Sequence, residues 1–71
     1  MMTVISQDKD VAIDTHMFWL NEFKDKSDVE VYCNDILMGI YDSRERANKV
    51  FDMYVQHKRE NKRLFIMPVN R

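Results

Sequence analysis

The sequence predicts an α+β domain: a single antiparallel sheet of four to six short strands, with one long helix on one face and a final short strand after the helix. Three observations support this prediction. Apolar residues recur at every second position between residues 29 and 41, as in strands buried on one face. An apolar stripe with helical spacing follows between residues 47 and 55. The 71 residues, 45% hydrophobic and 32% charged, are enough for one domain, over residues 1–71, and too few for two.

The N-terminal third of the chain is expected to form three strands. Residues 1–6 make the first strand, and residues 11–13 return as its hairpin partner after a polar turn at residues 7–10. Residues 16–23 (HMFWLNEF) are few and rich in aromatics, which favours a strand over a helix.

Residues 29–33 and 36–41 are expected to form a second hairpin. Asn34 and Asp35 make its turn, because both residue types tolerate a positive φ.

Strict alternation decides which side chains this hairpin exposes. With Val31 and Ile40 toward the helix, Tyr32 and Tyr41 lie on the opposite face. Such aromatics either pack within the protein, anchor a partner or stack on bases. Gly39 inside a strand indicates a bulge or the close approach of another segment.

The helix is expected over about residues 43–61. Asp42 or Ser43 can cap its N-terminus. Its apolar stripe consists of Ala47, Val50, Phe51, Tyr54 and Val55. Residues 64–67 form the last strand, and Pro68 ends it or lies on an edge.

The net charge of −1 conceals an asymmetry. Residues 1–42 hold three lysines and nine carboxylates, a net charge of −6, whereas residues 43–71 hold eight cations and three carboxylates, a net charge of +5. An acidic half is suited to a basic partner, and a basic half to phosphate. Both patterns also arise from aspartates in turns and cations at a helix C-terminus.

Two sets of candidate binding residues follow from this asymmetry. The candidates for binding a partner protein are Asp25, Asp28, Glu30, Tyr32, Asp35 and Tyr41. The candidates for binding nucleic acid or a small nucleotide ligand are Arg44, Arg46, Lys58, Arg59, Lys62 and Arg63.

We expect no enzyme activity, no metal site and no cofactor. His16, His57 and Cys33 have no ligand spacing, and a chain with one glycine has no Gly-rich phosphate loop. The single cysteine fits a reducing cytoplasm, and no apolar run is long enough to span a membrane. A chain of this size gains burial by self-association, so a homodimer is possible.

Three stretches carry a family resemblance: residues 5–9 (ISQDK), residues 39–50 (GIYDSRERANKV) and residues 65–68 (FIMP), the last with the terminal MP motif. Together they resemble a family of very small, uncharacterised proteins from Firmicutes and their phages. The resemblance implies no catalytic residue. It implies a phage or prophage context, in which small proteins without catalytic motifs often bind and block a host component.

The sequence therefore predicts a small non-enzymatic binding protein of the host cytoplasm. Its expected partner is a host protein, such as a defence or nucleic-acid-processing factor, bound through the acidic half. The alternatives are a nucleic-acid-binding accessory protein that uses the basic helix and tail, and an oligomer that sequesters a small nucleotide.

Overall fold

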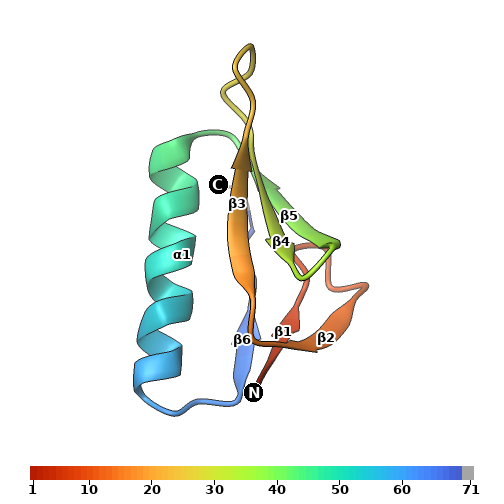
Figure 1. Cartoon of the computed structure of the whole chain (residues 1–71), viewed down its shortest axis with the longest axis vertical. Coiled ribbons are helices and arrows are strands. Elements are labelled where there is room, and N and C mark those ends of the chain that lie inside the picture. Colours follow the sequence, from red (N-terminus) through yellow and green to blue (C-terminus); the bar gives the residue numbers. More distant parts are fainter. Residues whose placement is uncertain (70–71) are drawn as a thin grey trace.

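The computed structural model describes residues 1–69 of the chain (Figure 1). The elements are β1 (Met2–Ile5), β2 (Ala12–Thr15), β3 (Phe18–Glu22), β4 (Val29–Cys33), β5 (Ile36–Tyr41), α1 (Arg44–Arg59) and β6 (Leu64–Ile66). The α+β class, the strand within residues 16–23, the turn at residues 34–35 and the last strand after the helix are confirmed.

The strands divide between two three-stranded sheets instead of forming one. One sheet has the order β2-β1-β6 and the other the order β3-β4-β5. All pairs are antiparallel except β1 and β6, which run parallel. The chain passes from one sheet to the other at Thr15, whose hydroxyl accepts a hydrogen bond from Met17 N (2.9 Å) and donates one to Met17 O (2.8 Å). This local pairing sets the corner between β2 and β3.

Gln7, which lies two residues beyond the end of β1, joins the two sheets. Its backbone N–H donates to Met38 O (2.8 Å) and its side-chain Nε2 donates to Ile40 O (2.9 Å), while its Oε1 accepts from Ile40 N (2.9 Å). Met38 and Ile40 lie on the edge of β5 that pairs with no strand. One residue therefore satisfies backbone groups that a sheet edge would otherwise leave open.

Gly39 allows Gln7 to come this close. A Cβ atom at Gly39 would lie 3.0 Å from the Gln7 Cβ and 3.2 Å from the Met67 Cε. The expected close approach at this glycine is therefore confirmed, and the approaching segment is the turn that follows β1.

The expected bulge is also present, and it reverses the predicted alternation in β5. The register between β4 and β5 shifts next to Met38, so β5 carries one extra residue. As a result Ile40 is 40% exposed and Tyr41 is fully buried, the reverse of the prediction. On the regular strand β4 the prediction is correct, because Val31 is buried and Tyr32 is not.

The helix packs its predicted stripe against both sheets. Ser43 is the N-cap, and its Oγ accepts from Arg46 N (3.1 Å). Contacts from α1 reach β3, β4, β5 and β6, and Figure 1 shows the helix alongside β3 and β6. The helix ends at Arg59 instead of near residue 61, because Asn61 adopts a left-handed conformation with φ 57°.

An aromatic cluster links the helix to a strand of each sheet. Phe18 from β3 stacks on Tyr54 from α1 at a ring-centroid distance of 4.2 Å. Phe65 from β6 meets both rings edge-on, at 6.0 Å and 5.9 Å. Each buried aromatic of this kind stabilises the fold by roughly 1.5–3 kcal/mol.

Replacing Gly39 with alanine should lower the free energy of unfolding by about 1–3 kcal/mol, because the added methyl overlaps Gln7 at the closely packed seam where the two sheets meet. Urea denaturation followed by Trp19 fluorescence measures this change. The backbone at Gly39 does not have a positive φ, so the loss would reflect packing and not backbone strain.

The matched control is the same substitution in a Gln7→Gly background, where the overlapping side chain is absent. Gly39→Ala should then destabilise the protein much less. Equal losses in both backgrounds would show that Gln7 does not set the requirement for glycine.

Candidate functional site

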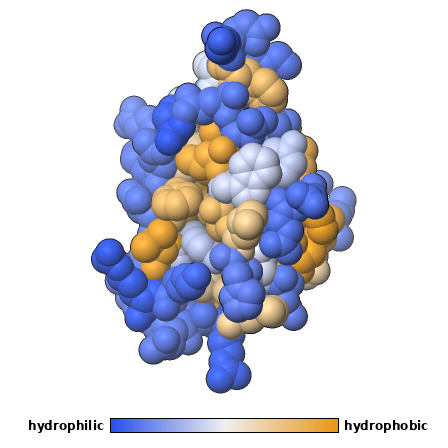
Figure 2. All heavy atoms as spheres, viewed as in Figure 1, coloured by the Kyte–Doolittle hydropathy of each residue, from blue (hydrophilic) through white to orange (hydrophobic). Residues whose placement is uncertain are grey.

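The face of the β3-β4-β5 sheet that points away from the helix exposes apolar and aromatic side chains together with polar groups. We call this surface the outer face. It consists of Trp19, Asn21, Glu30, Tyr32, Leu37 and Ile40. Trp19, Leu37 and Ile40 are 37%, 41% and 40% exposed. Figure 2 shows pale and hydrophobic residues gathered over β3 and β4, with hydrophilic residues around them.

The polar groups of the outer face hold one another in place. Trp19 and Tyr32 stack with ring centroids 4.7 Å apart and planes 15° apart, and Trp19 Nε1 donates to Asn34 O (2.8 Å). The Glu30 carboxylate accepts from the Tyr32 hydroxyl (3.1 Å) and from Asn21 Nδ2 (3.1 Å). The bond to Glu30 is the main cause that raises the pKa of Tyr32, so its phenol remains a donor. The aromatic pair is thereby oriented before any partner arrives.

The charged side chains of the β3-β4-β5 sheet are acidic. Its three strands contain Glu22 and Glu30 and neither lysine nor arginine. Glu22 forms an ion pair with Arg44 at the start of α1. Glu30 is therefore the carboxylate that the outer face offers to a partner, while Asp28 and Asp35 lie exposed beyond the two ends of β4.

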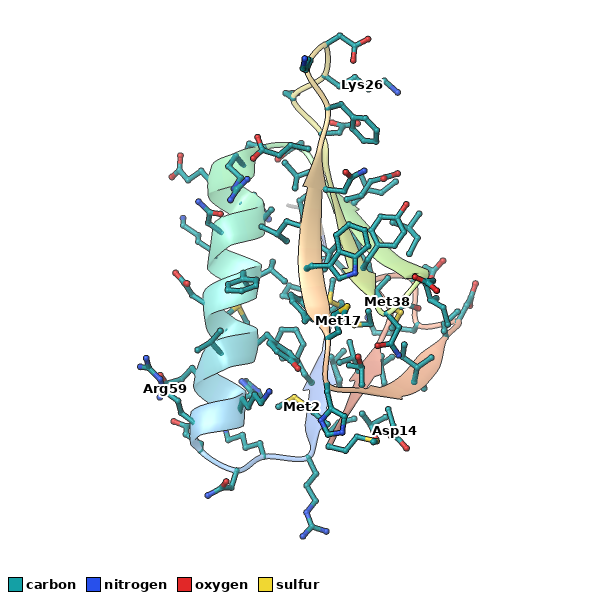
Figure 3. The ribbon with its side chains drawn as sticks, in the orientation of Figure 1. Met2, Asp14, Met17, Lys26, Met38 and Arg59 are labelled. Carbon is teal, nitrogen blue, oxygen red and sulfur yellow. The ribbon has the colours of Figure 1, made fainter. Side chains whose placement is uncertain are left out.

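The predicted acidic residues do not form one cluster. Asp25 and Asp28 lie in the loop between β3 and β4, which projects beyond the sheet (Figure 1) and carries Lys26 at its tip (Figure 3). Asp35 lies in the turn at the opposite end of β4. The predicted carboxylates thus flank the outer face from two sides, with Glu30 between them.

Tyr41 is not part of this surface, which corrects the prediction. It is fully buried, its hydroxyl donates to Pro68 O (2.7 Å), and burial raises its pKa to about 12. Ile40 takes its place on the outer face, beside Leu37. Strict alternation placed Ile40 on the inner face because the extra residue in β5 is visible in the sequence only as the neighbouring Gly39.

The predicted cationic residues separate into two groups. Arg44 and Arg46 lie in the first turn of α1, whereas Lys58 and Arg59 lie in its last turn. A 16-residue helix is about 24 Å long. The basic half of the sequence therefore does not fold into one continuous phosphate-binding surface.

The structure offers no activated nucleophile at Cys33. The side chain is fully buried, and this burial raises the pKa of the thiol to about 11. Across residues 1–69, no three His, Cys, Asp or Glu side chains are grouped so that they could hold a metal ion.

Comparisons with known proteins give no family for this chain: no family model, no curated protein and no solved structure matches it. In the described part of the chain, no helix has the length and apolarity needed to cross a membrane. The surfaces of the protein are therefore the basis for inferring its function.

Some residues of the three resembling stretches meet at the seam between the two sheets. Gln7, Gly39 and Met67 are in contact there, and Tyr41 bonds to Pro68. The packing of the seam gives these residues a structural role.

Cys33 should resist alkylation by iodoacetamide in the folded protein. A pKa of about 11 in place of 9.0 leaves about a hundredfold less thiolate at neutral pH, and burial also blocks access. Mass spectrometry should detect labelling in urea and almost none in buffer. Rapid labelling of the native protein at pH 7 would contradict the buried position.

Proposed function

We propose that this protein is a non-enzymatic binding domain whose outer face docks on a basic surface of a partner protein. The observation that carries the proposal is the exposed Trp19–Tyr32 stack, flanked by Leu37 and Ile40 and centred on the carboxylate of Glu30. Function would then consist of occupying a surface that the partner needs for its own activity.

The composition of the outer face matches the energetics of protein interfaces. Tryptophan and tyrosine are the residues that most often dominate binding energy, because they bury large areas and lose little rotamer entropy. The hydrogen bonds to Asn34 and Glu30 already restrict both side chains in the free protein. Docking therefore has less side-chain entropy to overcome than on an unordered surface.

Charge supports a basic partner over a second copy of this chain. Two copies of this chain meeting through their outer faces would bring one Glu30 toward the other, with no cation on β3, β4 or β5 to separate them. A lysine or arginine from a different protein would instead pair with Glu30 at the centre and with Asp28 and Asp35 at the rim. Such complementarity speeds encounter and selects the partner.

The biological setting is also part of the proposal. The resemblance to small phage and prophage proteins favours a host protein as the partner and inhibition as the outcome. Nucleic-acid binding is less favoured, because the two cationic groups lie at opposite ends of α1.

The test starts with immobilised protein and lysate of a bacterium that carries the gene. A protein identified in the bound fraction by mass spectrometry is then purified and titrated against the variants by biolayer interferometry. The double variant Leu37→Ser/Ile40→Ser should bind about tenfold more weakly or worse, which corresponds to roughly 1.4 kcal/mol or more. Glu30→Gln should bind severalfold more weakly and with less dependence on salt.

Two controls match these changes in chemistry but lie elsewhere. Leu64→Ser alters an exposed apolar residue of β6, and Asp52→Asn removes a carboxylate from α1. Both should retain wild-type affinity. Equal affinities for all four variants, or equal losses in all of them, would refute the outer face as the interface.

A further inference from the structure

A hollow of about 440 Å³ lies at the C-terminal end of α1, remote from the loop that carries Asp25. Residues from β1, from the β2–β3 corner and from the end of the helix form its wall. They include Tyr54, Lys58, Lys62 and Arg63. Figure 3 shows Met2, another wall residue, on the side of the helix that faces the strands, and Arg59 pointing away from it.

The end of the helix determines where the cations of this hollow lie. Asn61, with φ 57°, turns the chain back so that Asn61 N donates to Lys58 O (3.1 Å) and Lys62 N donates to His57 O (3.0 Å). This double closure is the Schellman motif, and it satisfies the last helical carbonyls. Arg63 O then accepts from Thr3 N (2.9 Å), which fixes the chain at the entry to β6. The cations are thus mounted on a hydrogen-bonded backbone.

The wall of the hollow is positively charged. It contains Lys58, Lys62 and Arg63 and neither aspartate nor glutamate. Lys62 Nζ lies 3.2 Å from a carboxylate oxygen of Glu60, which offsets its charge. Lys58 and Arg63 are the two cations that a bound anion would meet. Lysine and arginine are the usual side-chain ligands of phosphate.

Tyr54 gives the hollow a second polar feature. Its side chain lines the wall and is 5% exposed, and its hydroxyl is buried without a hydrogen-bond partner among residues 1–69. Burial is the main cause that raises the pKa of this phenol, so it remains a donor. A buried donor without an acceptor destabilises a fold, and such groups are rare in native proteins. The hydroxyl is covered in this structure, so a ligand in the hollow supplies the missing acceptor once the wall shifts enough to uncover it.

We infer that this hollow binds a phosphorylated small molecule of about mononucleotide size. The phosphate contacts Lys58 and Arg63, and an oxygen or nitrogen acceptor of the ligand receives the Tyr54 hydroxyl. The volume falls within the range of small-molecule sites. Phosphates of a nucleic-acid strand share the same chemistry, but a donor buried beneath the surface favours a compact ligand that enters the hollow. The inference does not depend on the outer face.

Isothermal titration calorimetry at 50 mM salt tests the inference with AMP, pyrophosphate and inorganic phosphate as probes. AMP or pyrophosphate should bind with one site per chain. Lys58→Gln and Arg63→Gln should each weaken binding severalfold, because both cations face the anion. Tyr54→Phe should weaken AMP binding about tenfold, the usual effect of losing a hydrogen bond in a buried site. Tyr54→Phe should unfold at no lower a urea concentration than the wild type, because it removes an unpaired hydroxyl.

The matched control is Lys49→Gln, which removes an exposed helical cation that does not line the hollow. It should bind AMP as the wild type does. The inference is overturned if none of the three probes binds, if Tyr54→Phe binds AMP as tightly as the wild type, or if Lys49→Gln weakens binding as much as Lys58→Gln. A twelve-nucleotide single strand that binds more tightly than AMP and depends on the same residues would overturn the assignment to a small molecule.

Discussion

Three hydrogen bonds between Gln7 and the edge of β5 are the constraint on which the rest of this structure depends. Strands of three to six residues leave two small sheets that could not each bury a core alone. Gln7, in the turn after the central strand β1, ties that sheet to the edge strand β5, and Gly39 and Met67 close the seam by contact. With the seam closed, one helix packs against all three strands of one sheet and against β6 of the other.

The same arrangement leaves two unlike surfaces open. Because α1 covers only one side of the β3-β4-β5 sheet, the alternate side chains of β3 and β4 form the outer face with its aromatic stack and its carboxylate. At the other end, the chain has to turn sharply from the helix into β6, which brings Lys58, Lys62 and Arg63 around a hollow. The charge asymmetry of the sequence thus becomes several separate groups: carboxylates on and around the outer face, and cations at both ends of the helix. It does not become a basic rod lying on an acidic sheet, since the arginines near Ser43 are far from the other cations.

Much of the fold could be predicted because local patterns determine it. The stripe of α1 and its serine cap, the turn at residues 34–35 and the buried side of β4 all depend on residues within a few positions of one another. The candidate sites were predicted less well. Glu30 and Tyr32 lie where the period of β4 places them, whereas Tyr41 was assigned to the wrong face.

The sequence by itself therefore determined the class of the fold, the type and order of its elements and the charge carried by each half. Only the tertiary structure decided that the strands form two sheets, that β6 runs parallel to β1, and that Ile40 is exposed in place of Tyr41. It also decided which cations share a hollow with the unpaired hydroxyl of Tyr54. The physical reason is that these features depend on how separate segments pair and pack, as when Gln7 bonds to Ile40, 33 residues further along the chain. No pattern within a single strand or helix encodes such a contact.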